Sequence, residues 1–225
     1  KIILASALSL LLVACGEDAA KEGKEASKAV VEEATQVVEK ATGAVEEKTV
    51  ADDATDAMKK KAAVAEAKAI IMAFGSALKA ELKTAMKAGG PKQALDVCHL
   101  AAGPIAGKVA KEKGAQISRV SLKNRNPANV PNDWQKAVLE DFDARAAKGE
   151  DIKTMGFAEV VENEGKKHLR FMKALPVGDG CLKCHGTAIN DDVQEKITAL
   201  YPNDKATGYE KGQVRGAVVI VKEMK

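Results

Sequence analysis

The chain has 225 residues, 30 % of them charged, and its net charge of +3 conceals an uneven distribution along the sequence. Residues 16–57 carry five Lys against twelve Asp and Glu, whereas residues 58–225 carry 29 basic and 20 acidic side chains. Every aromatic residue and every proline lies at or beyond Phe74, which excludes residues 16–57 from a substantial core, and the lack of basic residues interleaved with aromatics disfavours nucleic-acid binding.

The first segment predicts export and lipid anchoring. An apolar run over residues 2–13 is too short to span a bilayer as a mature helix, which is typical of a signal peptide over residues 1–14. The run ends in Leu12-Val13-Ala14-Cys15, which resembles a bacterial lipobox, so Cys15 is predicted to be lipidated. Two or three acyl chains would hold the chain firmly at a membrane. Gly16 after the cysteine favours the inner leaflet of the outer membrane, on the periplasmic side.

The next segment, residues 15–57, is predicted to be an acidic tether. Val31, Val38 and Val45 recur every seven residues, but this weak heptad spans barely two repeats and is interrupted by a glycine. We therefore expect a marginal charged helix or spacer instead of a stable coiled coil. The folded domain is predicted to occupy residues 58–225.

Two helices are expected at the start of that domain. Residues 58–88 show apolar positions at helical spacing, with lysines on the remaining face. Gly89-Gly90-Pro91 is a plausible start for a second helix around Cys98, with a kink or break near Gly103-Pro104. The apolar stripes consist of Ile71, Phe74, Leu78 and Leu82 in the first helix and of Leu95, Cys98, Ala102, Ile105 and Val109 in the second.

The remainder of the domain predicts a sheet with further helices. Strand alternation over residues 115–122 is followed by turn residues 124–132 and a helix over 133–148. Residues 157–162 and 167–175 flank Asn163-Glu164-Gly165 and predict a hairpin; a helix over 191–200 and a strand over 214–221 complete the chain. Helices first and an antiparallel sheet later indicate an α+β fold, with a long N-terminal helical segment and a sheet covered by helices.

Residues 181–185 have the pattern C-x-x-C-H, the attachment sequence of a c-type haem. One helical turn puts Cys181 and Cys184 on the same side, where each thiol can add to a haem vinyl group, and directs His185 at the iron. A redox dithiol would not require His185, and no second C-x-x-C or H-x-x-x-H completes a tetrahedral zinc site. We therefore predict one covalent haem c with His185 as the proximal ligand.

Of the four cysteines, Cys15 is assigned to the lipid and Cys181 and Cys184 to the haem, which leaves Cys98 without a role. An exported protein enters a compartment that oxidises thiols, so an unpaired thiol there needs an explanation. From the residues alone, a buried cysteine acting as a small hydrophobe is the favoured interpretation. His99 points about 100° away around a helix, so Cys98 and His99 cannot bind the same iron without unwinding it.

Several segments together resemble a bacterial family of c-type haem proteins with a PAS-like fold. The likeness covers about residues 70–222, and its motifs are more specific than C-x-x-C-H alone. They are Cys98 with the following Gly103–Ala106, the segment Ser121–Asn129 that contains R-N-P-A-N, Leu169–Lys173, Cys181–Gly186, and Gly208–Ala217.

The resemblance implies an iron ligand set. In that family the haem packs on an antiparallel sheet, with the motif histidine on one side of the iron and an upstream cysteine on the other. It therefore implies that His185 is the proximal ligand and Cys98 the distal one, with His99 as the runner-up sixth ligand. Gly103 stands where the family commonly has Ala, a departure that leaves the ligand assignment intact.

Arg125, Arg170 and Lys173 are candidates for pairing with the haem propionates, because buried carboxylates need a cationic partner and Arg offers a bidentate fork. Ordinary structural or surface charge is the alternative. Trp134 is expected to belong to the core.

Two functions follow, and no catalytic residue is predicted for either. The first is an envelope lipoprotein that senses redox state or a small ligand through a His/Cys-ligated haem and passes its signal to a separate envelope protein. The alternative is a low-potential electron-transfer cytochrome of an envelope respiratory chain, whose basic domain docks an acidic redox partner. A peroxidase-like haem enzyme is a weaker third possibility, because Cys98 would close the iron site.

Overall fold

The structure is a computed structural model that describes the backbone of residues 19–225 and the side chains of residues 54–225. The predicted signal peptide and the predicted lipidation at Cys15 lie outside the described residues. The chain divides into two units, Lys1–Thr55 and Asp56–Lys225. In the part described, no helix is both long enough and apolar enough to cross a membrane.

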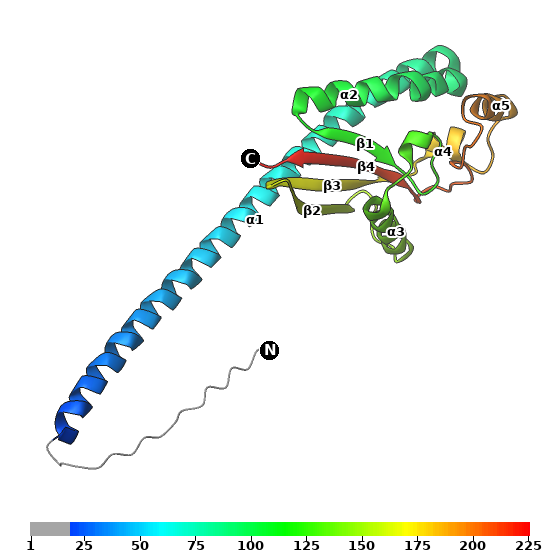
Figure 1. Cartoon of the computed structure of the whole chain (residues 1–225). Helices are drawn as coiled ribbons and strands as arrows, with labels where there is room; N and C mark the ends of the chain where they lie inside the picture. Colours follow the sequence, from blue (N-terminus) through cyan, green and yellow to red (C-terminus); the bar gives the residue numbers. More distant parts are fainter. Residues whose placement is uncertain (1–18) are drawn as a thin grey trace. The chain divides into compact units, whose positions relative to one another are not determined.

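Helices and strands alternate irregularly along the chain (Figure 1). Helix α1 (Ala19–Asp96) starts in the first unit and is followed by a π-helical turn (Val97–Ala101) and α2 (Ala102–Lys113). The remaining elements are β1 (Gln116–Val120), a 3-10 turn (Pro127–Asn129), α3 (Asp133–Ala147), β2 (Gly156–Asn163), β3 (Lys166–Pro176), α4 (Asp179–His185), α5 (Asp191–Leu200) and β4 (Val214–Glu223).

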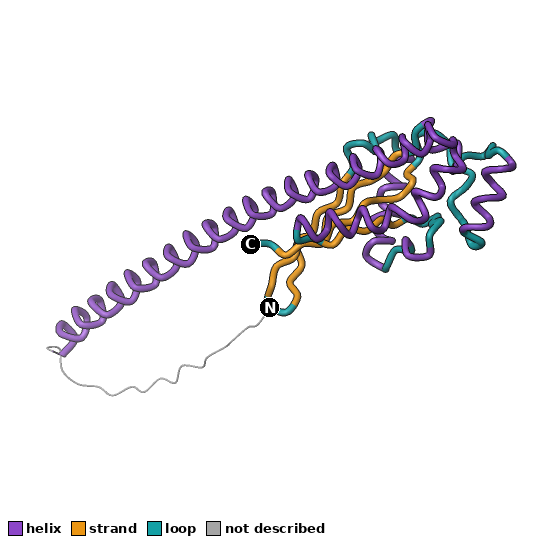
Figure 2. The backbone as a smooth tube through the Cα atoms, turned by 90° about the horizontal axis from the view of Figure 1, so that it is seen from above, coloured by secondary structure: helices purple, strands orange, loops and turns teal. Residues whose placement is uncertain are grey.

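The four strands form one antiparallel sheet in the order β1-β4-β3-β2. The strands lie in one layer with α1 and α2 running beside it (Figure 2), and α3 packs on the other face. The predicted α+β class, with an antiparallel sheet covered by helices and a long N-terminal helix, is confirmed.

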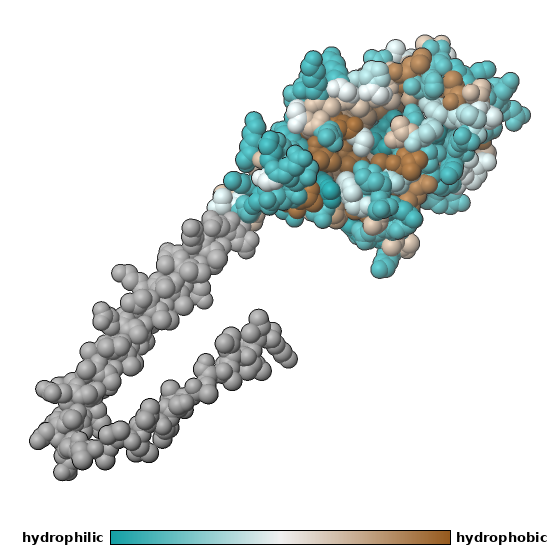
Figure 3. Space-filling model, in the orientation of Figure 1, coloured by the Kyte–Doolittle hydropathy of each residue, from teal (hydrophilic) through white to brown (hydrophobic). Residues whose placement is uncertain are grey.

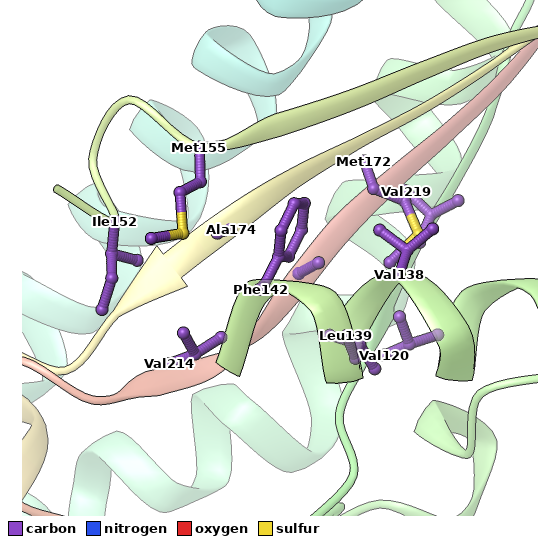
Figure 4. Packing of buried hydrophobic residues seen from close by; sticks show 11 residues of the cluster. Val120, Val138, Leu139, Phe142, Ile152, Met155, Met172, Ala174, Val214 and Val219 are labelled. Carbon is purple, nitrogen blue, oxygen red and sulfur yellow. The ribbon is translucent and has the colours of Figure 1, made fainter. Parts of the chain in front are cut away.

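Each strand supplies side chains to both faces because successive side chains alternate. On one face, α3 packs against a cluster that includes Phe142, Met155 and Met172, all three inaccessible to solvent (Figure 4). On the other face, α1 and α2 pack against alternate strand residues. The buried members of this second cluster are Ala67, Ile70, Phe74, Leu78, Ala102, Val109, Leu169, Phe171, Val218 and Ile220.

Local signals explain the elements that the sequence predicted well. Asn132 accepts a hydrogen bond from the backbone N–H of Gln135, whose side chain accepts one from the Asn132 N–H, so this capping box starts α3. Glu164 (φ 53°) and Gly165 (φ 71°) form the tight turn between β2 and β3. The structure confirms the predicted helix that begins at residue 133, the β2–β3 hairpin, the helix α5 and the final strand β4.

The region around Cys98 differs in detail from the prediction. Gly89 and Gly90 leave helical geometry, as expected for a second helix start, but the next irregularity is the π-helical turn and not a kink at Gly103-Pro104. Pro104 lacks the N–H that would bond the Leu100 carbonyl, and its ring crowds that oxygen, so the disturbance falls in the preceding turn.

The surface of the second unit is mainly hydrophilic, with apolar side chains visible over the middle of one face (Figure 3). Among the large apolar side chains that the structure describes, the exposed ones are Met58, Met72, Leu100, Leu122 and Val130. Leu100 lies in the π-helical turn that also carries Cys98.

Candidate functional site

Helix α4 carries the C-x-x-C-H motif in a single short helix. Cys181 and Cys184 are free, half-buried thiols, and the backbone N–H of Gly178 donates to the Cys181 sulfur at 3.4 Å. Gly186 ends the helix in a crowded position, where a Cβ atom would lie 2.6 Å from the Leu182 carbonyl oxygen. The glycine of the C-x-x-C-H-G sequence is therefore required by close backbone approach.

His185 is held in one tautomer. Its Nδ1 lies 2.7 Å from the carbonyl oxygen of Ala206, and a carbonyl can only accept, so Nδ1 carries the proton. Burial, together with the charges of Arg215 and Arg125, lowers the pKa of His185 to about 3. The ring is therefore neutral near pH 7, and Nε2 keeps a lone pair with which it can bind a metal ion.

The loop that follows α5 fixes the backbone around this histidine. The N–H of Tyr209 donates to the His185 carbonyl at 2.9 Å, and that of Gly208 donates to the Gly186 carbonyl at the same distance. The rings of His185 and Tyr209 meet edge to face with centroids 6.4 Å apart. These contacts leave the imidazole little freedom to reorient.

Arg125 joins the motif helix to the same loop. Its Nη2 donates to the Cys184 carbonyl at 2.6 Å and pairs with the Asp204 carboxylate at 3.0 Å. The Arg125 and Asp204 side chains are 8 % and 7 % exposed. The N–H of Ala206 in turn donates to Asp204, so one buried ion pair braces the carbonyl that holds His185.

Cys98 approaches the motif from the π-helical turn. Leu95, one turn earlier, packs in the same apolar cluster as Cys184, and Asp96 accepts a hydrogen bond from Lys196 of α5 at 2.7 Å. Burial raises the pKa of the half-buried Cys98 thiol. Burial also raises the pKa of Cys184, with a contribution from the charge of Cys98, so the two thiols lie within electrostatic reach.

His99 follows Cys98 in the π-helical turn and packs on Tyr201, the residue directly after α5. It is exposed, and its ring packs edge to face on the buried Tyr201, with centroids 5.3 Å apart. Burial raises the pKa of Tyr201, and the charge of Cys98 adds to that effect, so Tyr201 stands close to both side chains.

The other predicted site residues have partners in α3, in β2 and in the loop between these two elements. The Arg170 guanidinium lies 5.2 Å above the Trp134 ring and pairs with Glu159 at 3.5 Å. Lys173 donates to the backbone carbonyls of Lys153 and Met155. Trp134 packs against the α3 cluster as expected. Of the three candidate propionate partners, only Arg125 bonds to the motif helix.

Sequence reasoning missed the loop residues that build the site. Asp204, Ala206 and Tyr209 contact His185 or Arg125, and Arg215 acts on the charge of His185. Spacing gave no signal for them, since their partners lie far away in the chain. Within the described residues, no group of three or more His, Cys, Asp or Glu side chains could hold a metal ion.

Comparisons with known proteins give one family match. The model of a family described as Tll0287-like matches residues 18–222. A solved structure described as the crystal structure of the cyanobacterial heme-protein Tll0287 is 23 % identical, with a TM-score of 0.48, and the match covers 72 % of this chain and 92 % of that chain. None of the curated proteins compared matches the chain.

Proposed function

The chain belongs to the Tll0287-like family, and we propose that it binds one haem covalently through Cys181 and Cys184. The observation that carries this proposal is the state of His185. Its Nδ1 donates to the Ala206 carbonyl, its ring is neutral, and it follows two free thiols in one helical turn. The protein that gives the family its name is described as a heme-protein, which agrees with the proposal.

The described residues fit this group in a second respect. The Nε atoms of Arg125 and Arg215 are buried without a hydrogen-bond partner. A buried donor without an acceptor lowers the stability of the folded state, so these two atoms are suited to bind an acceptor on a ligand. Both arginines influence His185 electrostatically. When bound, the haem would supply an iron that cycles between ferric and ferrous states.

We infer that Cys98 would supply the second protein ligand to the iron of this haem. Burial raises the pKa of the Cys98 thiol, and the charges of Arg119, Arg125 and Arg215 offset part of that effect. Binding to the iron would itself favour the deprotonated thiol. A thiolate donates more electron density than a thioether, so this ligand would favour ferric iron and a low reduction potential. His99, packed on Tyr201 and exposed, is less well disposed for that role.

The two ligand positions are held unequally, which favours a sensor of redox state or of a small ligand. His185 is fixed by the Ala206 carbonyl and by backbone hydrogen bonds on both sides. Cys98 sits in an irregular turn that is tied to α5 by the partly exposed ion pair of Asp96 and Lys196 and by the packing of Leu95. One rigid and one yielding ligand position could couple iron chemistry to movement of the helices.

An electron-transfer cytochrome remains the alternative function. Residues 58–225 carry nine more basic than acidic side chains, which suits docking on an acidic redox partner. In either role, lipidation at Cys15 would place the protein on the periplasmic side of the envelope, in the outer membrane.

Covalent attachment is tested by producing the full chain together with a c-type haem maturation system. After denaturing electrophoresis, the wild type should retain haem stain and a mass increased by one haem, whereas Cys181→Ala/Cys184→Ala should retain neither. Cys98→Ala is the control and should keep its haem. Wild-type protein without covalent haem, or stain retained in the double variant, would contradict the proposal.

Carbon monoxide separates the two roles. A ferrous chain that binds carbon monoxide readily has an exchangeable ligand position and supports the sensor. A chain that remains six-coordinate in both oxidation states and excludes carbon monoxide supports the electron carrier.

A further inference from the structure

Three guanidinium groups lie within electrostatic reach of Cys98. Arg119, Arg125 and Arg215 all act on the charge of Cys98, and the last two also act on His185. Their positions are fixed by contacts: the Arg119 guanidinium lies 6.0 Å from the centre of the Phe74 ring, and Arg125 bonds to the motif helix. The cluster therefore belongs to the candidate site and not to the open surface.

Arg215 is anchored on one edge of its guanidinium. Its Nη1 donates to the Ser121 hydroxyl at 2.9 Å and to the Lys123 carbonyl at 3.2 Å, and its Cζ lies 5.3 Å from the centre of the Tyr209 ring. Tyr209 is the residue whose ring meets His185 edge to face. The Nε atom of Arg215 is buried and has no partner.

Positive charge in this cluster exceeds negative charge. Asp204 pairs with Arg125, but among the described residues neither Arg119 nor Arg215 forms an ion pair with a carboxylate. Burial, together with the charges of Arg125 and Arg119, lowers the pKa of Arg215. Arg125 is buried and Arg119 and Arg215 are partly buried, so these three cations with the one anion leave a net positive charge that a bound group could neutralise.

We propose that Arg215, together with Arg125, forms the buried site for the propionate carboxylates of the haem. This inference rests on the proposed haem function and replaces Arg170 and Lys173, whose partners lie in α3, in β2 and in the loop between them. A haem carries two propionates, whose negative charges would balance the net positive charge of the three arginines and Asp204. The partnerless Nε atoms offer one donor from each arginine, and a guanidinium bonds a carboxylate strongly.

Binding of mesohaem to the haem-free full chain tests the inference without any activity assay. Mesohaem has ethyl groups where haem has vinyls, so it cannot react with Cys181 or Cys184, and its dimethyl ester lacks the two carboxylates. The wild type should bind mesohaem at least roughly tenfold more tightly than the ester, as expected for charge-assisted hydrogen bonds. Arg215→Gln should lose most of this preference.

Two further variants complete the test. Arg170→Gln is the matched control and should keep the wild-type preference, while Arg215→Lys, which retains the charge, should keep part of it. Equal binding of acid and ester by the wild type would overturn the arginine site even if Arg215→Gln failed to fold. Failure of both compounds to bind a chain that also lacks covalent haem would overturn the proposed function itself.

Discussion

The candidate ligand His185 depends on residues that come later in the chain. The carbonyl of Ala206 fixes its tautomer, and the buried pair of Arg125 and Asp204 braces that carbonyl. The Cys181, Cys184 and His185 positions follow from one local motif, so the sequence could predict them. Arg215 could not be predicted as their neighbour, because its side chain is held by a hydrogen bond to Ser121, which lies 94 residues away in the sequence.

Replacing Asp204 tests the buried ion pair. Asp204→Ala leaves the Arg125 charge buried and removes the acceptor of the Ala206 N–H. We expect the free energy of unfolding to fall by about 3–5 kcal/mol. Urea unfolding followed by circular dichroism measures this change.

The matched control is Glu140→Ala. Glu140 pairs with Lys136 at 3.8 Å, and both side chains are more than half exposed. This variant should change stability by no more than about 1 kcal/mol. Similar losses in both variants would show that the Arg125–Asp204 pair has no special importance.

At the scale of elements, the π-helical turn gives Cys98 its position. The sequence predicted a kink or break near Gly103-Pro104, and the irregular residues are Val97–Ala101, just before this pair. Pattern reasoning identifies the proline but not how the backbone distributes its effect, because hydrogen bonds one turn earlier change from four-residue to five-residue spacing. By contrast, α3 and the β2–β3 hairpin were predictable from their own capping and turn residues.

Restoring an N–H at position 104 should regularise this turn. Pro104→Ala can donate to the Leu100 carbonyl, which favours an α-helical turn and rotates Cys98 out of its present direction. In the haem-loaded chain we expect the ferric optical spectrum to gain a high-spin component. Gly103→Ala is the control, since a Cβ there meets no atom within 4 Å. An unchanged spectrum in Pro104→Ala would contradict the role of the turn.

Strand β4 depends on a glycine beside the site. Gly216 has φ 148°, and a Cβ atom there would lie 2.3 Å from the Val120 carbonyl oxygen. Gly216→Ala should lower the free energy of unfolding by about 2–4 kcal/mol, measured by urea unfolding. Gly212→Ala has a positive φ but open space, and should cost only about 1 kcal/mol. Equal losses of stability in the two variants would contradict this prediction, because they would show that the close contact with the Val120 carbonyl adds no cost.

At the scale of the whole molecule, acidic and aromatic residues are concentrated in different parts of the chain. The acidic, aromatic-free residues 16–57 contrast with the basic second unit, whose sheet is buried on both faces. Composition predicted this contrast and the α+β class, because both depend on patterns along the chain. The assembly of the candidate site from the π-helical turn, α4 and the loop after α5 could not be predicted, because it depends on packing between distant segments.

Lipid anchoring is a prediction about the whole chain. When the full chain is expressed in bacteria, the wild type should enter the detergent phase on phase partitioning, whereas Cys15→Ser should remain in the aqueous phase because it has no acylation site. Immunoblotting of both phases measures the distribution. Equal partitioning of the two proteins would rule out lipidation at Cys15.

The central claim is that Cys98 and His185 bind one iron from opposite sides, and an optical redox titration of Cys98→Ala tests it most directly. Loss of the electron-rich thiolate should change the ferric spectrum and raise the midpoint potential, whereas His99→Ala should match the wild type in both respects. A Cys98→Ala protein with the wild-type spectrum and potential would contradict the claim, as would loss of the sixth ligand in His99→Ala.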